Sequence, residues 1–316
     1  MTDCAKTAEP SEQQPALRTA ASRLCPVSVA AANWQGRLAL TFCDRQGETY
    51  LSRCFVQAPL KVQRPFYPEG RGVCHGVMLH TAGGIVGGDR LSTTLQLEAN
   101  AHALLTTATA GKVYRSNGQE AQQEVQISLA SGACLEWLPQ ETIVFNGAEF
   151  RQQLRVDLEP GALWMGWEIA RLGRSARGER FVCGNWRSHT QVWQAGRLIW
   201  VDPQWVAGGS EMMESLHGLA GYPVIASFAL LGHPVSGELV ERVRSLWEAL
   251  PEQEVRSQHG VPRNVLTQVG VTRLMSGLLC RYRGTSTQEA RRWFTTVWHL
   301  LRWELLNRPP CLPRVW

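Results

Sequence analysis

The chain has 316 residues, of which 44% are hydrophobic, and its 32 basic and 27 acidic side chains give a formal net charge of +5. This length and composition allow one large domain or two modest ones, each with a buried core. The longest apolar run, 223–232, is about half the ~20 residues that a membrane-spanning helix needs, so no transmembrane helix is predicted.

Residues 1–25 contain acidic residues, prolines and glutamines but no apolar core, so we expect a disordered tail and no secretory signal. One domain is expected over 26–316. Nine cysteines are scattered without a CxxC pair, and the closest histidines, His75 and His80, are spaced for neither one helix face nor one strand face. This pattern argues against a disulfide framework and a stable metal site, and it favours the reducing cytoplasm.

The basic side chains are almost all arginine, since Lys6, Lys61 and Lys112 are the only lysines. The rigid guanidinium fork suits pairing with carboxylates, so interface ion pairs are expected before a nucleic-acid footprint. Thirteen tryptophans accompany these arginines. Trp and Arg are enriched at protein interfaces, but a large core also consumes tryptophans, and both interpretations stay open.

Between residues 37 and 203 the sequence alternates apolar and polar residues in short runs, with turns about every ten residues. Leu38, Leu40 and Phe42 begin the pattern, which predicts a first hairpin closed by a turn at 44–47. Asn146-Gly147, between two apolar runs, is the strongest hairpin signal. We therefore predict a mainly β fold, an elongated scaffold of many short antiparallel strands.

Two α-helices are predicted in the C-terminal half. The first, near 236–250, has a single apolar stripe with Ser236 as its cap and Pro251 as its stop. The second, near 286–306, begins with a capping box of Ser286 and Glu289. Its tryptophans, Trp293 and Trp298, indicate either a helical lid over the core or a docking surface, and packing is favoured.

The glycine-rich turn 80–89 imitates a phosphate-binding loop without its chemistry. Gly83 and Gly88 have the Walker A spacing, but Asp89 stands where the lysine belongs and Arg90 where the Ser or Thr belongs. A carboxylate at the lysine position would repel a phosphate. The turn is therefore expected to be architectural.

Parts of the sequence are also compatible with two other functions. A carboxylate-based hydrolase could use Glu136 and Glu141, although the sequence has neither a GxSxG nor an HExxH motif. An Arg- and Trp-rich nucleic-acid-binding protein could use the basic segment 171–180 for the backbone and nearby aromatic rings for the bases. The arginines of that segment are Arg171, Arg174, Arg177 and Arg180, and the nearby tryptophans are Trp164, Trp167 and Trp186.

Five segments together resemble the UreD family of urease accessory proteins, also called UreH. They are 80–91, 106–116, 135–147, 169–181 and the C-terminal RPPCLPRVW at 308–316, and they occur in the family's order over most of the chain. The sequence departs from the family where Thr81-Ala82 replaces two expected prolines and Asn146 replaces an expected Asp. Residues 1–25 resemble an added tail.

The resemblance implies a non-enzymatic maturation factor that joins UreF and the GTPase UreG on apo-urease. Nickel would then reach the urease active site through an internal water-filled passage, and the partner alone would use GTP. No cofactor would be bound stably, and no nucleic acid or membrane would be a partner. An ion in transit must be held weakly, and carboxylates hold nickel more weakly than thiolate clusters do.

By position in the matching motifs, the acids Asp89, Glu141, Glu168 and Glu179 are candidates for the passage or its entrance. Arg115, Arg171 and Arg174 are their candidate orienting partners. Trp293, Trp298 and Trp316 are candidates for partner docking.

Overall fold

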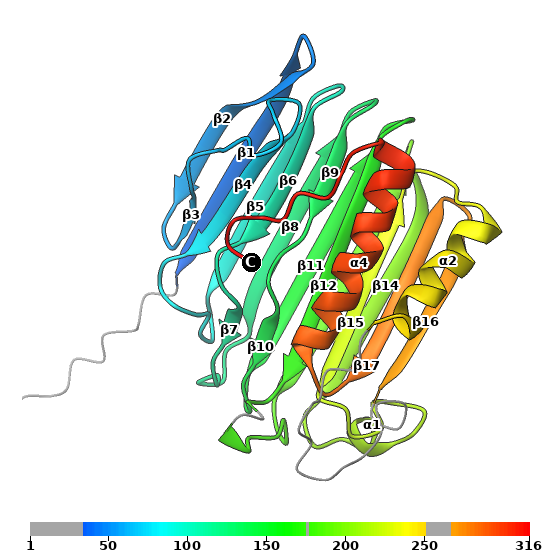
Figure 1. Cartoon of the computed structure of the whole chain (residues 1–316). Coiled ribbons are helices and arrows are strands. Elements are labelled where there is room, and N and C mark those ends of the chain that lie inside the picture. The colour runs from blue at the N-terminus through cyan, green and yellow to red at the C-terminus, as the bar shows by residue number, and fades with distance from the viewer. Residues whose placement is uncertain (1–33, 175–176, 251–266) are drawn as a thin grey trace, which may run out of the picture. The chain divides into compact units, whose positions relative to one another are not determined.

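Two large β-sheets carry most of the chain (Figure 1). The computed structural model describes residues 34–174, 177–250 and 267–316, and residues 33–316 cluster as one unit. The predicted tail 1–25 and the predicted helix stop at Pro251 lie outside the described residues. Strands outnumber helices throughout the described ranges, so the mainly β prediction is confirmed.

The first sheet has seven strands in the order β14-β13-β11-β8-β5-β1-β2. Their bounds are β1 Gln35–Arg45, β2 Glu48–Gln57, β5 Arg90–Leu97, β8 Ala121–Leu129, β11 Glu149–Leu158, β13 Asn185–Gln194 and β14 Arg197–Ala207. The second sheet has the order β16-β17-β15-β12-β9-β6-β4-β3, and the short strands β7 and β10 extend it beside β12. Their bounds are β3 Leu60–Val62, β4 Cys74–His80, β6 His102–Thr107, β7 Gly111–Val113, β9 Cys134–Trp137, β10 Thr142–Val144, β12 Leu163–Leu172, β15 Val224–Leu231, β16 Gln268–Leu274 and β17 Gly277–Gly284.

From β4 to β13 the chain winds back and forth between the two sheets, apart from the short strands β7 and β10. Strands β5, β8, β11 and β13 pair in parallel in the first sheet, and β4, β6, β9 and β12 pair in parallel in the second. The predicted antiparallel arrangement is wrong for this coil and correct at the margins, as in β1 with β2 and β15 with β17. Alternating residues and glycine turns look the same in a hairpin and in a coil, because both need short strands with one buried face.

The Asn146-Gly147 turn shows the difference. It joins β10, in the second sheet, to β11, in the first sheet, so the predicted hairpin does not form. Gly147 has a φ of 80°, and a Cβ atom there would lie 2.9 Å from Cγ of Arg115. Glycine is therefore needed both for the turn and for this close approach.

The two ends of the coil have unequal connections. At one end the connections 98–101, 130–133 and 159–162 are short. At the other end, drawn at the bottom of Figure 1, the connections 81–89, 108–120, 138–148 and 173–184 are longer and include β7 and β10. Four of the five segments that resemble the UreD family, all except 308–316, include parts of these long connections.

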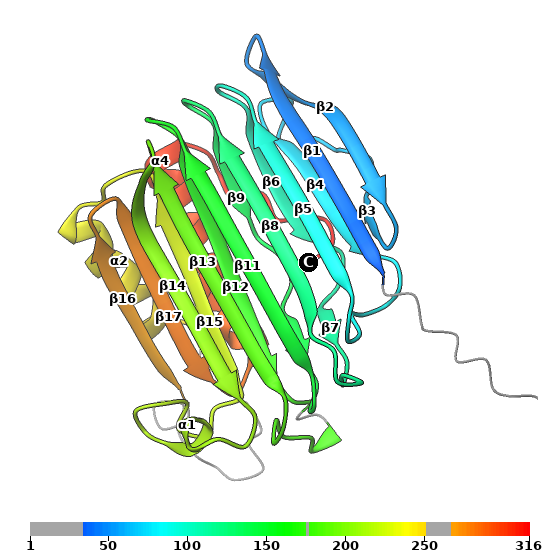
Figure 2. The same cartoon turned by 180° about the vertical axis from the view of Figure 1, so that it is seen from behind.

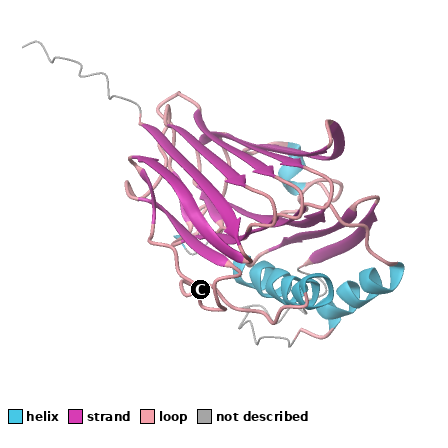
Figure 3. Ribbon diagram, turned by 90° about the horizontal axis from the view of Figure 1, so that it is seen from above, coloured by secondary structure: helices cyan, strands magenta, loops and turns pink. Residues whose placement is uncertain are grey.

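Both predicted helices are present and lie on the outer face of the second sheet, α2 at Gly237–Glu248 and α4 at Thr287–Leu306 (Figures 1 and 3). Oγ of Ser236 accepts a hydrogen bond from the Leu239 N–H, and Oγ of Ser286 accepts one from the Glu289 N–H. A third, short helix, α1 at Glu211–Glu214, was not predicted. The outer face of the first sheet carries neither α2 nor α4 (Figure 2).

The second sheet therefore has two buried faces. Along β12, Trp167 and its alternate neighbours point outward, and the Trp167 ring lies 6.3 Å from Phe294 of α4. Trp164 points inward, 6.5 Å from Trp200 of β14 in the first sheet. None of the helices in the described ranges has the length and hydrophobicity to cross a membrane.

The tryptophans of α4 belong to the packing and not to the surface. Trp293 and Trp298 are both 0% exposed, which contradicts their predicted docking role and agrees with the favoured packing interpretation. Trp316 is half-buried, stacks on Trp167 at 5.2 Å and donates a hydrogen bond from Nε1 to Oγ1 of Thr106 at 3.1 Å. The fold uses these rings because the space between a sheet and a helix needs large apolar side chains.

Candidate functional site

Asp89 closes the glycine turn. Its Oδ2 accepts a hydrogen bond from the Val86 N–H at 2.9 Å, its Oδ1 accepts one from the Trp34 N–H at 3.2 Å, and the residue is 2% exposed. Both oxygens are thus occupied by backbone donors. This arrangement agrees with the architectural role expected for the turn.

Glu179 lies in the long-connection end beside its predicted partner Arg174. Oε2 of Glu179 accepts a hydrogen bond from Nε of Arg174 at 2.8 Å, and Oε1 accepts one from the Asn146 N–H at 3.0 Å. The hydrogen bond from Arg174 lowers the pKa of Glu179. The Arg174 guanidinium also lies 4.4 Å from the centre of the Phe145 ring, so this carboxylate is held in place from two sides.

The contacts of Asn146 explain why a neutral amide can stand where an Asp is expected. Its Oδ1 accepts hydrogen bonds from the N–H groups of Val182 and Cys183 at 2.8 and 3.0 Å. An amide oxygen, like a carboxylate oxygen, has two lone pairs and can accept both bonds. Arg115 packs over the same turn and makes no ion pair among the described residues, so its orienting role stays a prediction.

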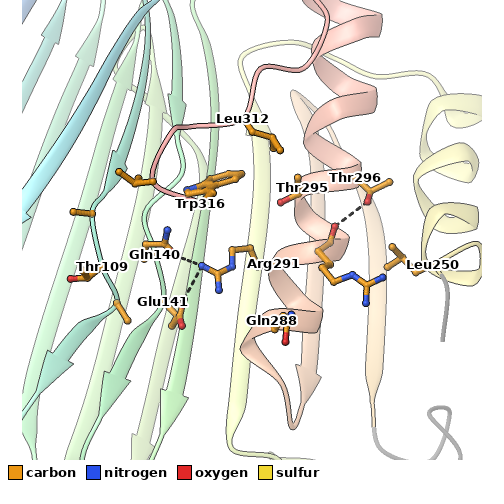
Figure 4. Close-up of a pocket in the computed structure, with 14 residues that line it drawn as sticks. Thr109, Gln140, Glu141, Leu250, Gln288, Arg291, Thr295, Thr296, Leu312 and Trp316 are labelled. Carbon is orange, nitrogen blue, oxygen red and sulfur yellow. Dashed lines mark hydrogen bonds and ion pairs between the residues drawn. The ribbon is translucent and has the colours of Figure 1, made fainter. Parts of the chain in front are cut away.

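Glu141 lies at a pocket of about 690 Å³ beside α4 (Figure 4). Its Oε2 is 3.3 Å from Nη1 of Arg291, which also donates a hydrogen bond to Gln140. The predicted partner Arg171 instead donates to the Thr285 carbonyl at 3.1 Å. Burial lowers the pKa of Arg171, and the charge of Glu141 partly offsets this. The direct partner of Glu141 is therefore Arg291, which the sequence did not identify.

Glu168 lies on the inward face of β12, between the sheets. Oγ of Ser188 donates a hydrogen bond to its Oε2 at 2.7 Å, and Nε2 of Gln152 donates to its Oε1. These neighbours come from β13 and β11 of the opposite sheet. A carboxylate that joins the two sheets through neutral donors is thus placed inside the coil.

Further polar side chains lie in the same space between the two sheets. Nη2 of Arg281 is 2.7 Å from Oδ1 of Asp202, and its Nη1 is 3.1 Å from Oγ of Ser227. We call the group the inter-sheet polar cluster; its members are Gln152, Glu168, Ser188, Asp202, Ser227 and Arg281. They come from six strands, so the cluster spans both sheets.

Burial raises the pKa of Glu168 to about 7, and the charge of Asp202 adds to the rise. The hydrogen bonds from Ser188 and Gln152 and the charge of Arg281 oppose it. At neutral pH this side chain therefore exchanges its proton easily, and a carboxylate that can lose a proton can accept a divalent cation in its place.

A second charged group lies on the outward face of the same sheet, under α4. Glu136 is 0% exposed; its Oε1 is 2.7 Å from Nε2 of His102, and its Oε2 is 3.0 Å from Nε of Arg302 and accepts a hydrogen bond from Trp298. Nη2 of Arg302 lies 2.8 Å from both oxygens of Glu69. We call these five residues the helix-sheet charge network.

The pKa values in this network follow from its pairing. Burial alone would raise the pKa of Glu136, but the hydrogen bond from His102 and the charges of His102 and Arg302 outweigh it and lower the pKa. Burial would lower the pKa of His102, but its contacts with Cys134 and Glu136 outweigh it and raise the pKa to about 10. The network therefore holds its charges at neutral pH.

The sequence missed this network and most of the inter-sheet polar cluster. The sequence suggested Glu136 only as a hydrolase carboxylate, whereas in the structure both of its oxygens are bonded to neighbouring side chains. The pocket is lined by Glu141 and not by Glu136, so the two do not form a carboxylate pair there. Two features of the sequence could have indicated these groups: Ser227 lies within the longest apolar run, and Arg302 lies on the apolar side of α4.

The nucleic-acid interpretation also loses its aromatic platform. Trp164, Trp167 and Trp186 are at most 3% exposed, so no base can stack on them. Arg174 pairs with Glu179 and Arg180 with Glu214.

The described residues also contain one group of potential metal ligands. Glu69, His75 and Cys311 each bring one potential ligand atom within 4.8 Å of the other two.

The chain is similar to known proteins over nearly all of the described fold. A family model for the UreD urease accessory protein matches residues 35–316. Urease accessory protein UreD of Nostoc sp. (strain PCC 7120) is 56% identical over 283 residues, which cover 90% of this chain and 96% of that protein. The proteins of the same name from Nostoc punctiforme and Acaryochloris marina are 55% and 54% identical, over 92% and 90% of this chain and 98% and 96% of their own. The chain therefore belongs to the UreD family of urease accessory proteins.

Proposed function

We propose that this protein is a non-enzymatic urease maturation factor of the cytoplasm. It joins UreF and the GTPase UreG to apo-urease and supports the delivery of nickel to the urease active site. Nickel is cargo in transit, and GTP is used by the partner alone. The single observation that carries the proposal is the inward-facing Glu168, a carboxylate with a pKa of about 7 between the two sheets.

The chemistry of the inter-sheet polar cluster suits transit better than storage. Its donors to a cation are carboxylate, hydroxyl and amide oxygens, which bind a borderline ion such as Ni²⁺ more weakly than thiolates or several imidazoles do. Arg281 lies against Asp202 and balances part of the negative charge. An ion would therefore be attracted into the interlayer without being trapped there.

The four candidate acids have different parts in this proposal. Asp89 and Glu179 have their oxygens occupied by backbone or arginine donors, so they hold the loops of the long-connection end in shape. Glu141 lines the pocket at the surface and is the candidate entrance residue. Glu168 is the candidate for the passage itself.

The test replaces Glu168 with Ala and, separately, with Gln in cells that make urease and all accessory proteins at limiting nickel. Both variants should lower the nickel content of purified urease severalfold, because neither side chain can exchange a proton for the ion. Recovery of the complex with tagged UreF should stay at the wild-type level. Nickel is measured by mass spectrometry and urease by its activity.

The matched control is Glu98→Gln, which removes one carboxylate from an exposed position. It should leave nickel loading unchanged. Normal loading in both Glu168 variants would contradict the passage, and loss of the UreF complex would mean that the substitution had damaged assembly instead. Turnover of any substrate by the purified chain would contradict the non-enzymatic proposal.

Partner docking is proposed for Trp316 alone among the three tryptophans. It lines the pocket in Figure 4 and keeps part of its surface exposed. Trp316→Ala should weaken binding to UreF by about 10-fold, the effect expected when an aromatic anchor worth roughly 1–2 kcal/mol is lost. Unchanged affinity in a folded variant, measured by calorimetry, would exclude this role.

A further inference from the structure

Three potential metal ligands converge where the C-terminal segment 307–316 crosses the second sheet. Glu69 precedes β4, His75 lies within β4, and Cys311 comes from the far end of the chain. One ligand atom of each lies within 4.8 Å of the other two. In a tetrahedral site with bonds of 2.0–2.3 Å the ligand atoms are roughly 3.3–3.8 Å apart, so the three side chains already lie near binding distance.

His75 has a nitrogen without a partner. Nε2 lies 2.7 Å from Oε1 of Glu69, whereas Nδ1 is buried and has no hydrogen-bond partner in the structure. The side chain is 0% exposed. Nε2 is the nitrogen that faces Glu69, so an ion held between the two side chains would replace this hydrogen bond and bind Nε2.

Arg302 competes for Glu69 but does not block it. Each carboxylate has about four lone-pair sites, so one oxygen can bind an ion while the other keeps its hydrogen bond to Arg302. The guanidinium has other anchors, since its Nε contacts Glu136 at 3.0 Å and its Nη1 donates to the Pro309 carbonyl at 2.8 Å. Arg302 therefore stays in place and holds the segment beside Cys311.

The surroundings favour a site that an ion can enter. Cys311 is half-buried, so the residue keeps part of its surface exposed. The Phe66 ring lies 5.4 Å from the His75 ring and forms an apolar wall on one side. Arg314 of the same segment lies over this ring at 4.5 Å, so the wall also anchors the segment that carries Cys311.

We propose that Glu69, His75 and Cys311 bind one divalent transition-metal ion of borderline softness, Zn²⁺ or Ni²⁺, which ties the segment 307–316 to strand β4. The ligand set of one carboxylate, one imidazole and one thiolate suits such ions and leaves a fourth position for water. The site lies on the opposite face of the second sheet from Glu168. It is therefore independent of the proposed passage, and its failure would leave that function untouched.

The first experiment titrates the purified full chain, in separate arms, with Zn²⁺ and with Ni²⁺. Cys311→Ser should lose one tightly bound equivalent of at least one of the two ions relative to wild type. Cys183→Ser removes an exposed cysteine elsewhere and should keep that equivalent. Equal binding by wild type and Cys311→Ser in both arms would overturn the proposal, and the arm that responds identifies the ion.

The second experiment needs no variant and so does not depend on a variant folding. Trypsin releases Cys311 in the peptide 303–314, because the bond between Arg308 and Pro309 resists cleavage, and this peptide contains no other cysteine. Bound ion should slow alkylation of Cys311 by iodoacetamide at least severalfold, and a chelator should restore the rate. Mass spectrometry of the peptide measures both, and an alkylation rate unaffected by either ion would overturn the proposal.

Discussion

Glu136 and Glu168 are two interior carboxylates of one sheet with opposite acid strength. Glu136 faces α4 and has a lowered pKa, because cationic and indole donors surround it. Glu168 faces the other sheet, where burial outweighs the neutral donors and raises its pKa to about 7. The two residues lie on neighbouring strands, β9 and β12. Depth in the fold does not explain the difference, because the fully buried Glu136 has the lowered pKa and Glu168, with the raised pKa, is only half-buried.

The comparison separates a carboxylate with a fixed charge from one whose charge can change near neutral pH. A carboxylate with two cationic partners is fixed in charge and position and stabilises the attachment of α4 to the sheet. A carboxylate with neutral partners changes its charge near neutral pH and can respond to an arriving cation. The two faces of the second sheet thus differ in their acids. The face under α4 holds a carboxylate of fixed charge that stabilises the fold, and the face toward the first sheet holds a carboxylate whose charge can change.

The largest expected effect comes from Arg302→Ala. The substitution leaves Glu136 and Glu69 buried without their shared cation, and breaking such a buried pair costs about 3–5 kcal/mol. Urea unfolding followed by circular dichroism measures the loss. Arg242→Ala is the matched control, because Arg242 pairs with Glu304 at the surface, where solvent screens the ion pair and its loss should change stability little.

If Arg302→Ala lowered the free energy of unfolding by less than about 1 kcal/mol, the helix-sheet charge network would contribute no more than a surface ion pair does. The contrast between a stabilising Glu136 and a titrating Glu168 would then fail.

The next effect is the pH dependence that Glu168 causes. Its pKa is higher in the folded chain than the ordinary value of 4.5, so the folded state binds more protons between these values and the free energy of unfolding falls as pH rises. The shift to about 7 corresponds to a loss of about 3 kcal/mol between pH 4.5 and pH 7. Glu168→Gln should remove this slope, and urea midpoints at several pH values compare the two proteins.

Matching slopes in wild type and Glu168→Gln would mean that Glu168 titrates normally, and the contrast with Glu136 would then disappear.

The smallest effect is expected for Ser188→Ala. Loss of its hydrogen bond to Glu168 should cost about 1 kcal/mol of stability. The same bond lowers the pKa of Glu168, so its removal should move the pH-dependent transition to a higher pH. The transition is measured by the same unfolding series, and a downward movement would show that Ser188 does not donate to the charged carboxylate.

The local features of the fold could be predicted from the sequence, and the pairing of distant segments could not. Helix α4 could be predicted because Ser286 and an apolar stripe lie within one short window. Glu168 became a candidate because an acid interrupts an apolar strand, and its role in a passage stays a prediction. The direction of strand pairing was wrong because a turn such as Asn146-Gly147 does not encode which sheet the next strand joins. Arg302 and Glu69 were missed as partners because 233 residues separate them.

The coil described here resembles a repeat protein in one respect, because each pair of consecutive strands contacts only the pairs beside it. Such an architecture can evolve by gaining or losing a whole winding, since neighbouring windings keep their register. Growth of this kind needs terminators, and reversals of chain direction at β1 with β2 and at β13 with β14 provide them. They end the stack in the way that capping repeats end a solenoid.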